Sequence, residues 1–168
     1  AASGAAGGYA KRQRTANASA AYRAQQPHVR LAKLFESAVL IPALRNRHYA
    51  AFFQPVSTKQ FPTYRDKIKT PMDLATVRER LTQRYVYRDR EALLRDLNQI
   101  LTNSLIFNGP ESPVTAAARQ LVDDATNALD AVADQLDALE KETRENAALA
   151  SSRRKKPASA PKPPPKHA

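Results

Sequence analysis

Apolar residues recur every three or four positions in four stretches of the chain, which is the spacing of one face of an α-helix. The pattern predicts helices at about residues 29–44, 73–81, 89–107 and 112–149. Pro42 marks the approaching end of the first helix. The apolar faces are formed by Leu31, Leu34, Phe35, Ala38 and Ile41, then Leu74, Val77 and Leu81, then Leu93, Leu97, Ile100, Leu101 and Ser104, and finally Val114, Ala118, Leu121, Ala125, Leu129, Val132, Leu136 and Leu139.

Polar residues mark where three of these helices begin. Asp73, Asp89 and Ser112 each precede an apolar face, and their side chains are expected to accept hydrogen bonds from the first free backbone amides. Pro113 falls in the first turn of the last helix, where its missing N–H costs nothing. The third helix is expected to stop at residues 108–110, Asn-Gly-Pro, because Gly permits a left-handed backbone and Pro cannot continue the helix.

No alternating strand pattern competes with these helices, so the predicted fold is all-α, a four-helix bundle. The connection from Arg45 to Thr70 is too long for an ordinary bundle loop. It contains six apolar or aromatic residues, Tyr49, Phe52, Phe53, Val56, Phe61 and Tyr64. The loop is therefore expected to pack over one end of the bundle, where it can form a wall of a ligand pocket.

Charge is concentrated at the two ends of the chain, which has a net charge of +11. Residues 1–28 carry four cations and residues 149–168 carry six, neither with an acid, whereas residues 29–148 are close to neutral. Both ends are rich in Ala, Gly, Ser or Pro, so we expect disordered basic tails on either side of a bundle. Their KRQR and RRKK sequences are typical of nuclear import or weak nucleic-acid contact, but solubility and linker function would also explain them.

Several classes of function are excluded by composition. The absence of cysteine excludes disulfides, zinc–thiolate sites and thiol nucleophiles. The longest apolar run, residues 38–44, is far too short to span a bilayer, and no signal segment is visible. The three histidines are scattered, and the sequence contains neither a recognisable motif around a nucleophilic Ser or Asp nor a glycine-rich phosphate-binding loop. No enzyme activity, catalytic residue, metal or cofactor is therefore expected. Because position 1 is Ala, the chain is expected to be processed or part of a longer protein.

Four short motifs follow one another at defined spacings. They are PV at 55–56, P-x-Y at 62–64, I-x-x-PMDL at 68–74, and N-S-x-x-F-N at 103–108. In this order they resemble the bromodomain family over about residues 29–140, and the stretch NSLIFNGPES at 103–112 resembles one subfamily in particular. The resemblance implies a left-handed four-helix bundle with a deep pocket between the long first loop and the loop after the third helix, which binds acetylated lysine.

The resemblance also implies roles for seven residues. Asn108 matches the asparagine whose side-chain amide donates to the acetyl carbonyl, and Tyr64 matches the tyrosine that reaches this carbonyl through an ordered water. The remaining matches are Val56, Phe61 and Phe107 on the pocket walls, Val114 at the gatekeeper position, and Phe52 on the shelf beside the pocket mouth.

Two positions depart from the family pattern. The shelf is often Trp-Pro-Phe, but here it is Ala50, Ala51 and Phe52, which predicts a weaker and wider shelf. Position 107 is Phe where Tyr is frequent, so one hydroxyl is missing from the wall.

The resemblance implies acetylated lysine peptides as partners, histone tails first among them, within a larger nuclear transcription or chromatin complex and without membrane contact. Two alternatives stay open. The missing Trp-Pro is compatible with a degenerate bromodomain that serves as a protein-interaction scaffold, and the basic tails are compatible with a nucleic-acid-associated protein.

Overall fold

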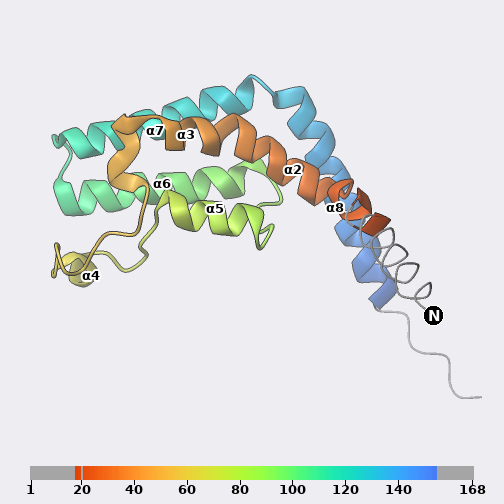
Figure 1. Cartoon of the computed structure of the whole chain (residues 1–168), viewed down its shortest axis with the longest axis horizontal. Helices are drawn as coiled ribbons and strands as arrows, with labels where there is room; N and C mark the ends of the chain where they lie inside the picture. The colour runs from red at the N-terminus through yellow and green to blue at the C-terminus, as the bar shows by residue number, and fades with distance from the viewer. Residues whose placement is uncertain (1–17, 20, 155–168) are drawn as a thin grey trace, which may run out of the picture.

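The computed structural model describes residues 18, 19 and 21–154, which form a helical bundle with no β-strand in this part of the chain (Figure 1). The elements are α2 (Pro27–Phe35), η1 (Glu36–Leu40), α3 (Ile41–Arg45), η2 (Arg47–Phe52), α4 (Tyr64–Lys67), α5 (Leu74–Thr82), α6 (Arg90–Asn108), α7 (Pro113–Asp130) and α8 (Ala133–Arg154). The all-α prediction is confirmed. The four expected helices correspond to α2 through α3, α5, α6, and α7 with α8.

The first helical run is continuous from α2 through η1 to α3, although Pro42 lies inside it. Segment η1 is a π-helix, in which the amide of Ile41 donates to the carbonyl of Glu36, five residues earlier. Proline cannot donate a backbone hydrogen bond, and its ring crowds the carbonyl four residues before it. The wider π-turn immediately before Pro42 relieves this crowding, so the helix continues to Arg45 rather than breaking.

The three predicted N-caps are confirmed. The side chain of Asp73 accepts from the amide of Thr76 at 2.9 Å, and Asp89 accepts from the amide of Ala92 at 2.8 Å. The hydroxyl of Ser112 accepts from the amide of Val114 at 3.2 Å. These bonds satisfy backbone donors that the first helical turn leaves free.

The last helix was predicted as one element, and this is wrong because it divides into α7 and α8 at residues 131–132. The amide of Val132 donates to the carbonyl of Leu129, three residues earlier instead of four, which tightens the backbone there. Neither Gly nor Pro marks this position. The new direction lets α8 run along α2, where Arg30 pairs with Glu142 at 3.0 Å (Figure 1). Tertiary packing therefore overrides a local pattern that favours a straight helix.

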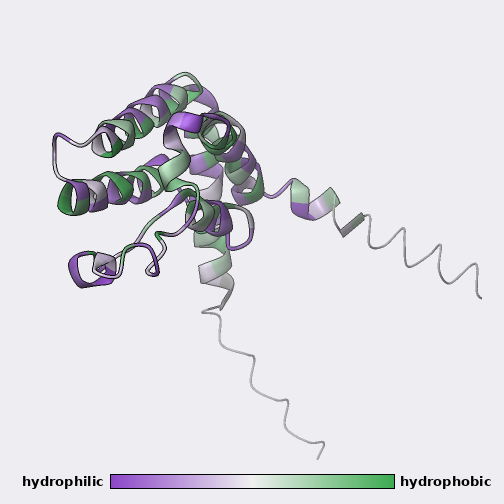
Figure 2. Cartoon of the chain, turned by 60° about the vertical axis from the view of Figure 1, so that its left-hand side comes forward, coloured by the Kyte–Doolittle hydropathy of each residue, from purple (hydrophilic) through white to green (hydrophobic). Residues whose placement is uncertain are grey.

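The core runs along the inside of the bundle and is built from the predicted apolar faces. Its fully buried residues include Leu31 and Phe35 of α2, Val77 and Leu81 of α5, Leu93 and Leu97 of α6, Leu121 and Leu129 of α7, and Leu136 of α8. Each helix carries hydrophobic and hydrophilic residues in turn along its surface (Figure 2). Burial of one such leucine stabilises the fold by about 1.5–3 kcal/mol.

The segment between α3 and α5 packs against the bundle, as its aromatic content predicted. It contains η2, the single turn of α4, and otherwise irregular backbone. Tyr49, Phe52, Tyr64 and Ile68 from this segment are buried. The segment covers the end of the bundle where α6 and α7 are joined (Figure 1).

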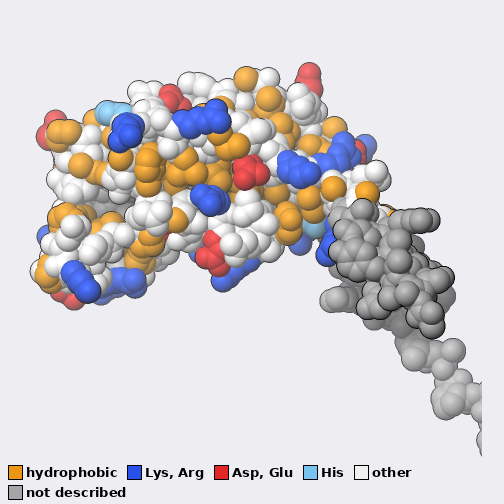
Figure 3. Space-filling view, viewed as in Figure 1, with side chains coloured by type: hydrophobic (Ala, Val, Ile, Leu, Met, Phe, Trp, Pro, Cys, Tyr) orange, Lys and Arg blue, Asp and Glu red, His pale blue; other side chains and the backbone are white. Residues whose placement is uncertain are grey.

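The expected boundaries at residues 29 and 148 both fall short of the helices. Residues 21–24 are helical, α2 begins at Pro27, and α8 continues to Arg154. Residues 1–17, 20 and 155–168 of the predicted tails, which include KRQR, lie outside the described residues, as do the side chains of RRKK. Over the face drawn in Figure 3, cations and anions are interspersed. No helix in the described part of the chain is long and apolar enough to cross a membrane.

Candidate functional site

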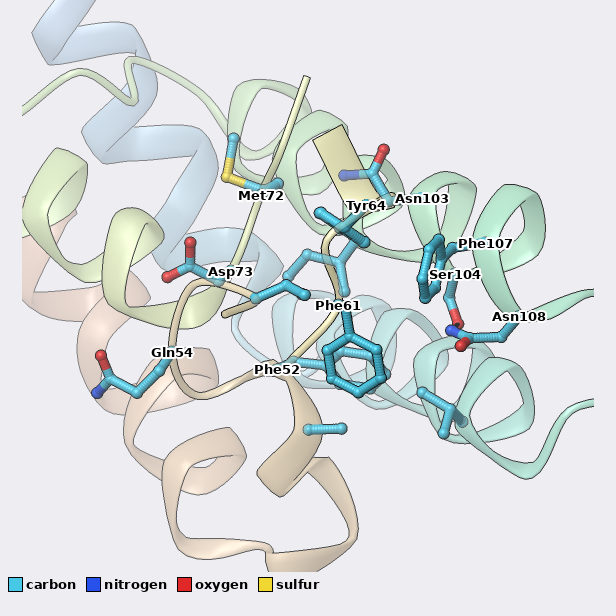
Figure 4. Close-up of a pocket in the computed structure, with 14 residues that line it drawn as sticks. Phe52, Gln54, Phe61, Tyr64, Met72, Asp73, Asn103, Ser104, Phe107 and Asn108 are labelled. Atoms are coloured by element: carbon cyan, nitrogen blue, oxygen red, sulfur yellow. Dashed lines mark hydrogen bonds between the residues drawn. The ribbon is translucent and has the colours of Figure 1, made fainter. Parts of the chain in front are cut away.

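A cavity of about 160 Å³ lies at the end of the bundle where the long segment meets α6 and α7. All seven residues predicted from the sequence line this cavity: Phe52, Val56, Phe61, Tyr64, Phe107, Asn108 and Val114. They come from the segment between α3 and α5, from α6 and from α7, so the fold gathers them into one site (Figure 4). Their individual roles in binding stay predictions.

Asn108 is the last residue of α6 and lies at the exposed edge of the cavity. The chain leaves the helix at Gly109, whose φ of 85° falls in a region that side-chain-bearing residues rarely adopt. Its amide closes the helix by donating to the carbonyl of Leu105 at 3.2 Å. This turn lets α6 end abruptly and leaves the carboxamide of Asn108 at the mouth of the cavity.

The carboxamide of Asn108 donates one hydrogen bond inside the protein, from Nδ2 to the hydroxyl of Ser104 at 3.0 Å (Figure 4). Ser104 lies one helical turn earlier and is itself 4% exposed. Because an asparagine side chain carries two N–H donors, the second remains for a ligand. The site therefore offers a directed donor beside an apolar space.

Three aromatic rings form one side of the cavity. Phe107 contacts Tyr64 edge to face, with 4.9 Å between ring centroids, and contacts Phe61 in the same manner at 6.0 Å. On this side the ammonium of Lys67 lies 5.6 Å from the centre of the Phe107 ring, a cation–π distance. Phe61 is 48% exposed, whereas Tyr64 is buried, so the wall runs from the solvent into the interior.

The hydroxyl of Tyr64 is protonated at neutral pH. Burial, followed by the nearby carboxylate of Asp73, raises the pKa of Tyr64 above its ordinary value. No hydrogen bond to this hydroxyl is formed within the described residues, so it can both donate to and accept from a water molecule.

Sequence reasoning did not assign Asn103 to the site, although it lies within the matched motif and lines the cavity. Its Nδ2 donates to the carbonyl of Thr70 at 2.8 Å, and its Oδ1 accepts from Gln99 at 2.8 Å. Asn103 therefore fastens the end of the long segment to α6. The signal available in the sequence was its position three residues after Ile100, which places a polar amide on the face that α6 buries.

Met72, Asp73 and Ser104 also line the cavity without having been assigned to it. Asp73 was interpreted only as a helix cap, and both of its oxygens are indeed engaged by Thr76, one by the amide and one by the hydroxyl. Ser104 had been placed on the apolar face of its helix. Its spacing of four residues from Asn108 was a signal that the two side chains meet.

Two of the three shelf positions beside the cavity are alanine, and the weaker and wider shelf expected from them stays a prediction. Ala51 lines the cavity and Ala50 is exposed, so neither position projects a large side chain. Phe52 alone supplies a ring there and is 7% exposed.

This arrangement suits a neutral ligand with an apolar stem and one hydrogen-bond acceptor. No group of histidine and acidic residues able to hold a metal occurs among the described residues. The cavity thus offers apolar walls, the free N–H of Asn108 and the hydroxyl of Tyr64.

Comparison with known proteins agrees with the geometry. A family model described as Bromodomain matches residues 37–120, which is half of the chain. The chain therefore belongs to the bromodomain family. A structure of the bromodomain from human BAZ1A superposes with a TM-score of 0.54 at 22% sequence identity, covering 60% of this chain and 92% of that one. This likeness confirms the predicted left-handed helical bundle.

Among curated proteins, the chain is 40% identical over 126 residues to transcription initiation factor TFIID subunit 1 of Drosophila melanogaster and 34% identical over 120 residues to that of Arabidopsis thaliana. These alignments cover 74% and 71% of this chain but only 6% of each relative. Bromodomain subunit bdf1 of the SWR1 complex from Schizosaccharomyces pombe is 34% identical over 79 residues, which are 46% of this chain and 14% of that protein. Residues 103–112 had indicated the largest TFIID subunit, and this subfamily is confirmed, while the choice of its second bromodomain stays a prediction.

Proposed function

We propose that this domain binds acetylated lysine in other proteins, with Asn108 donating its free N–H to the acetyl carbonyl. The observation that carries the proposal is a largely apolar cavity of about 160 Å³ with the carboxamide of Asn108 at its edge, held by Ser104 so that one N–H remains for a ligand. An acetylated lysine has the matching features: a four-carbon stem, a methyl cap and one carbonyl acceptor.

Discrimination against unmodified lysine follows from the charge of its ammonium group. An ammonium has three donors and no acceptor, so it cannot use the N–H of Asn108, and it must lose its hydration on entry. The carboxylate that lines the cavity, Asp73, is 4% exposed and already accepts two hydrogen bonds from Thr76. It therefore compensates an entering cation poorly, and desolvation dominates the selectivity.

Tyr64 completes the recognition of the carbonyl in this proposal. A carbonyl oxygen has two lone pairs, and Asn108 occupies one of them. A water held by the Tyr64 hydroxyl would occupy the other, and such bridges are enthalpically nearly as good as direct hydrogen bonds.

The relatives support a role in transcription or chromatin regulation, and hence a nuclear location. Their names place them in TFIID and in the SWR1 complex, which suggests that this domain also works within a larger assembly. We propose acetylated histone tails as its partners. We assign it a binding role and no catalytic step.

Calorimetric titration with acetylated and unmodified histone-tail peptides tests the proposal. We expect the acetylated peptides to bind more tightly than the unmodified ones, and a loss of about tenfold or more in affinity of the acetylated peptides for Asn108→Ala, since a directed donor in a dry site is removed. Asn98→Ala is the matched control, because Asn98 lies on the same helix and its exposed amide bonds to the carbonyl of Leu94. Equal affinity for both peptide forms would contradict acetyl-lysine recognition. An unchanged affinity in Asn108→Ala would favour the interaction scaffold.

A further inference from the structure

Two buried hydroxyl groups lie behind the carboxamide of Asn108. The Oγ of Ser104 is 3.0 Å from the Oγ1 of Thr115, and Thr115 is 0% exposed. Thr115 also donates to the carbonyl of Gly109 at 2.8 Å. A continuous series of hydrogen bonds therefore runs from the backbone carbonyl of Gly109 through Thr115 and Ser104 to the side chain of Asn108.

The direction of every bond in this series is determined by the carbonyl at its end. A carbonyl only accepts, so the single proton of Thr115 is donated to Gly109. Thr115 must then accept from Ser104, whose own proton is thereby used. Ser104 can consequently only accept from Asn108, which means that the NH₂ group, not the oxygen, of the carboxamide faces Ser104.

This direction matters because the two ends of a carboxamide are nearly equal in size and opposite in hydrogen-bonding character. With NH₂ held against Ser104, its second N–H is presented beside the cavity. Rotation of the amide by half a turn would present the oxygen instead, which repels an acetyl carbonyl and attracts an ammonium.

We propose that Thr115 and Ser104 are positioning residues that fix the orientation of the Asn108 carboxamide and so set the preference for acetylated over unmodified lysine. This inference rests on the proposed function and deepens it. Thr115 does not line the cavity, so its effect on a ligand passes through Ser104 and Asn108.

Thr115→Val tests the proposal without altering the cavity wall. Valine has nearly the same shape but removes the acceptor for the proton of Ser104. That proton becomes free to be donated to the oxygen of Asn108, and the flipped carboxamide becomes accessible. We expect affinity for an acetylated histone-tail peptide to fall about fivefold to tenfold, the effect of one lost hydrogen bond, while affinity for the unmodified peptide does not fall.

Two variants separate this role from simple destabilisation. Thr115→Ser keeps the hydroxyl and should restore affinity to within about twofold of the parent. Thr126→Val removes a hydroxyl from the same helix, one that donates to the carbonyl of Val122 and is remote from the cavity, and should leave affinity unchanged. If Thr115→Val retains the parent affinity and selectivity, or if it lowers both peptide affinities in proportion, the positioning role is overturned.

Nuclear magnetic resonance of the ligand-free protein tests the orientation independently of binding. The side-chain NH₂ signals of Asn108, assigned by their absence in Asn108→Ala, should shift in Thr115→Val and in Ser104→Ala but not in Thr115→Ser. Shifts with this pattern would support the hydroxyl series even if no acetylated peptide bound, in which case only the proposed function would fail. Unshifted signals in both Thr115→Val and Ser104→Ala would overturn the series itself.

Discussion

The two ends of the bundle are held together by different chemistry. At the end away from the cavity, Arg90 donates from its backbone amide and from Nε to one oxygen of Glu140, at 2.8 and 3.1 Å, and also pairs with Asp137. At the cavity end, the carboxylate of Asp73 is bonded to Thr76 within its own helical turn. The groups around Asn108 are neutral and are joined to one another: Asn108 to Ser104, Ser104 to Thr115, and Asn103 to a backbone carbonyl.

The difference shows how a small domain separates stability from binding. Charge pairs fix the paths of α6 and α8 where no ligand enters. Near the cavity, a free charge would hold water and compete with a neutral ligand, so orientation there depends on hydroxyl and amide groups. Substitutions at the two ends should accordingly change different measurements.

The largest expected effect is on stability. It concerns the end of the bundle away from the cavity, where Arg90, Asp137 and Glu140 pair, which we call the charged end. Glu140→Ala removes a carboxylate that is 6% exposed and leaves Arg90 with one of its acidic partners, so the free energy of unfolding should fall by about 2–3 kcal/mol. Urea denaturation measures this change, and acetyl-peptide affinity should not change.

Glu142→Ala is the matched control on the same helix. Its partner Arg30 is 49% exposed, and exposed pairs contribute about 0–1 kcal/mol. Equal losses of stability in the two variants would remove the distinction between buried and exposed pairs at this end.

A smaller effect is expected at the cavity. Tyr64→Phe keeps the ring against Phe107 but removes the hydroxyl proposed to hold a bridging water, so acetyl-peptide affinity should fall about threefold to fivefold. Calorimetry measures the affinity, and thermal unfolding should show little change. Tyr22→Phe, at a ring that is 68% exposed, serves as control. An affinity equal to that of the parent would exclude the water bridge.

The smallest effect concerns pH and lies again at the charged end. Burial, and then the charge of Arg88, lowers the pKa of His28 below its ordinary value. The unfolded chain therefore takes up this proton at a higher pH than the folded chain does. Stability should decline as the pH falls from about 7 to about 5.

His28→Gln should flatten this decline, while His48→Gln, at an exposed side chain, should not. Denaturation curves at several pH values make the comparison. A decline that persists unchanged in His28→Gln would assign the pH dependence to other groups.

Local features of this fold were predictable because they depend on neighbouring residues. The caps at Asp73, Asp89 and Ser112 require only a polar side chain and the next turn of helix. The division between α7 and α8 was not predictable, since no residue at 131–132 breaks a helix and the new direction depends on contacts with α2.

The cavity likewise combines features that the sequence predicts with features that only the folded structure reveals. Its seven predicted residues belong to motifs that can be matched in order along the chain, and the structure brings them all to one cavity. The pairing of Ser104 with Thr115 joins two helices across eleven positions, and the bond from Asn103 to Thr70 spans thirty-three. Such contacts exist only after the bundle has formed, so the sequence pattern alone does not reveal them.

The packing of α8 along α2 has an architectural consequence. The start of α2 and the end of α8 emerge together on the side opposite the cavity (Figure 1). Within the described residues, α2 therefore begins and α8 ends on the side away from the mouth of the cavity. A peptide can therefore approach the cavity without passing the described start of α2 or the described end of α8.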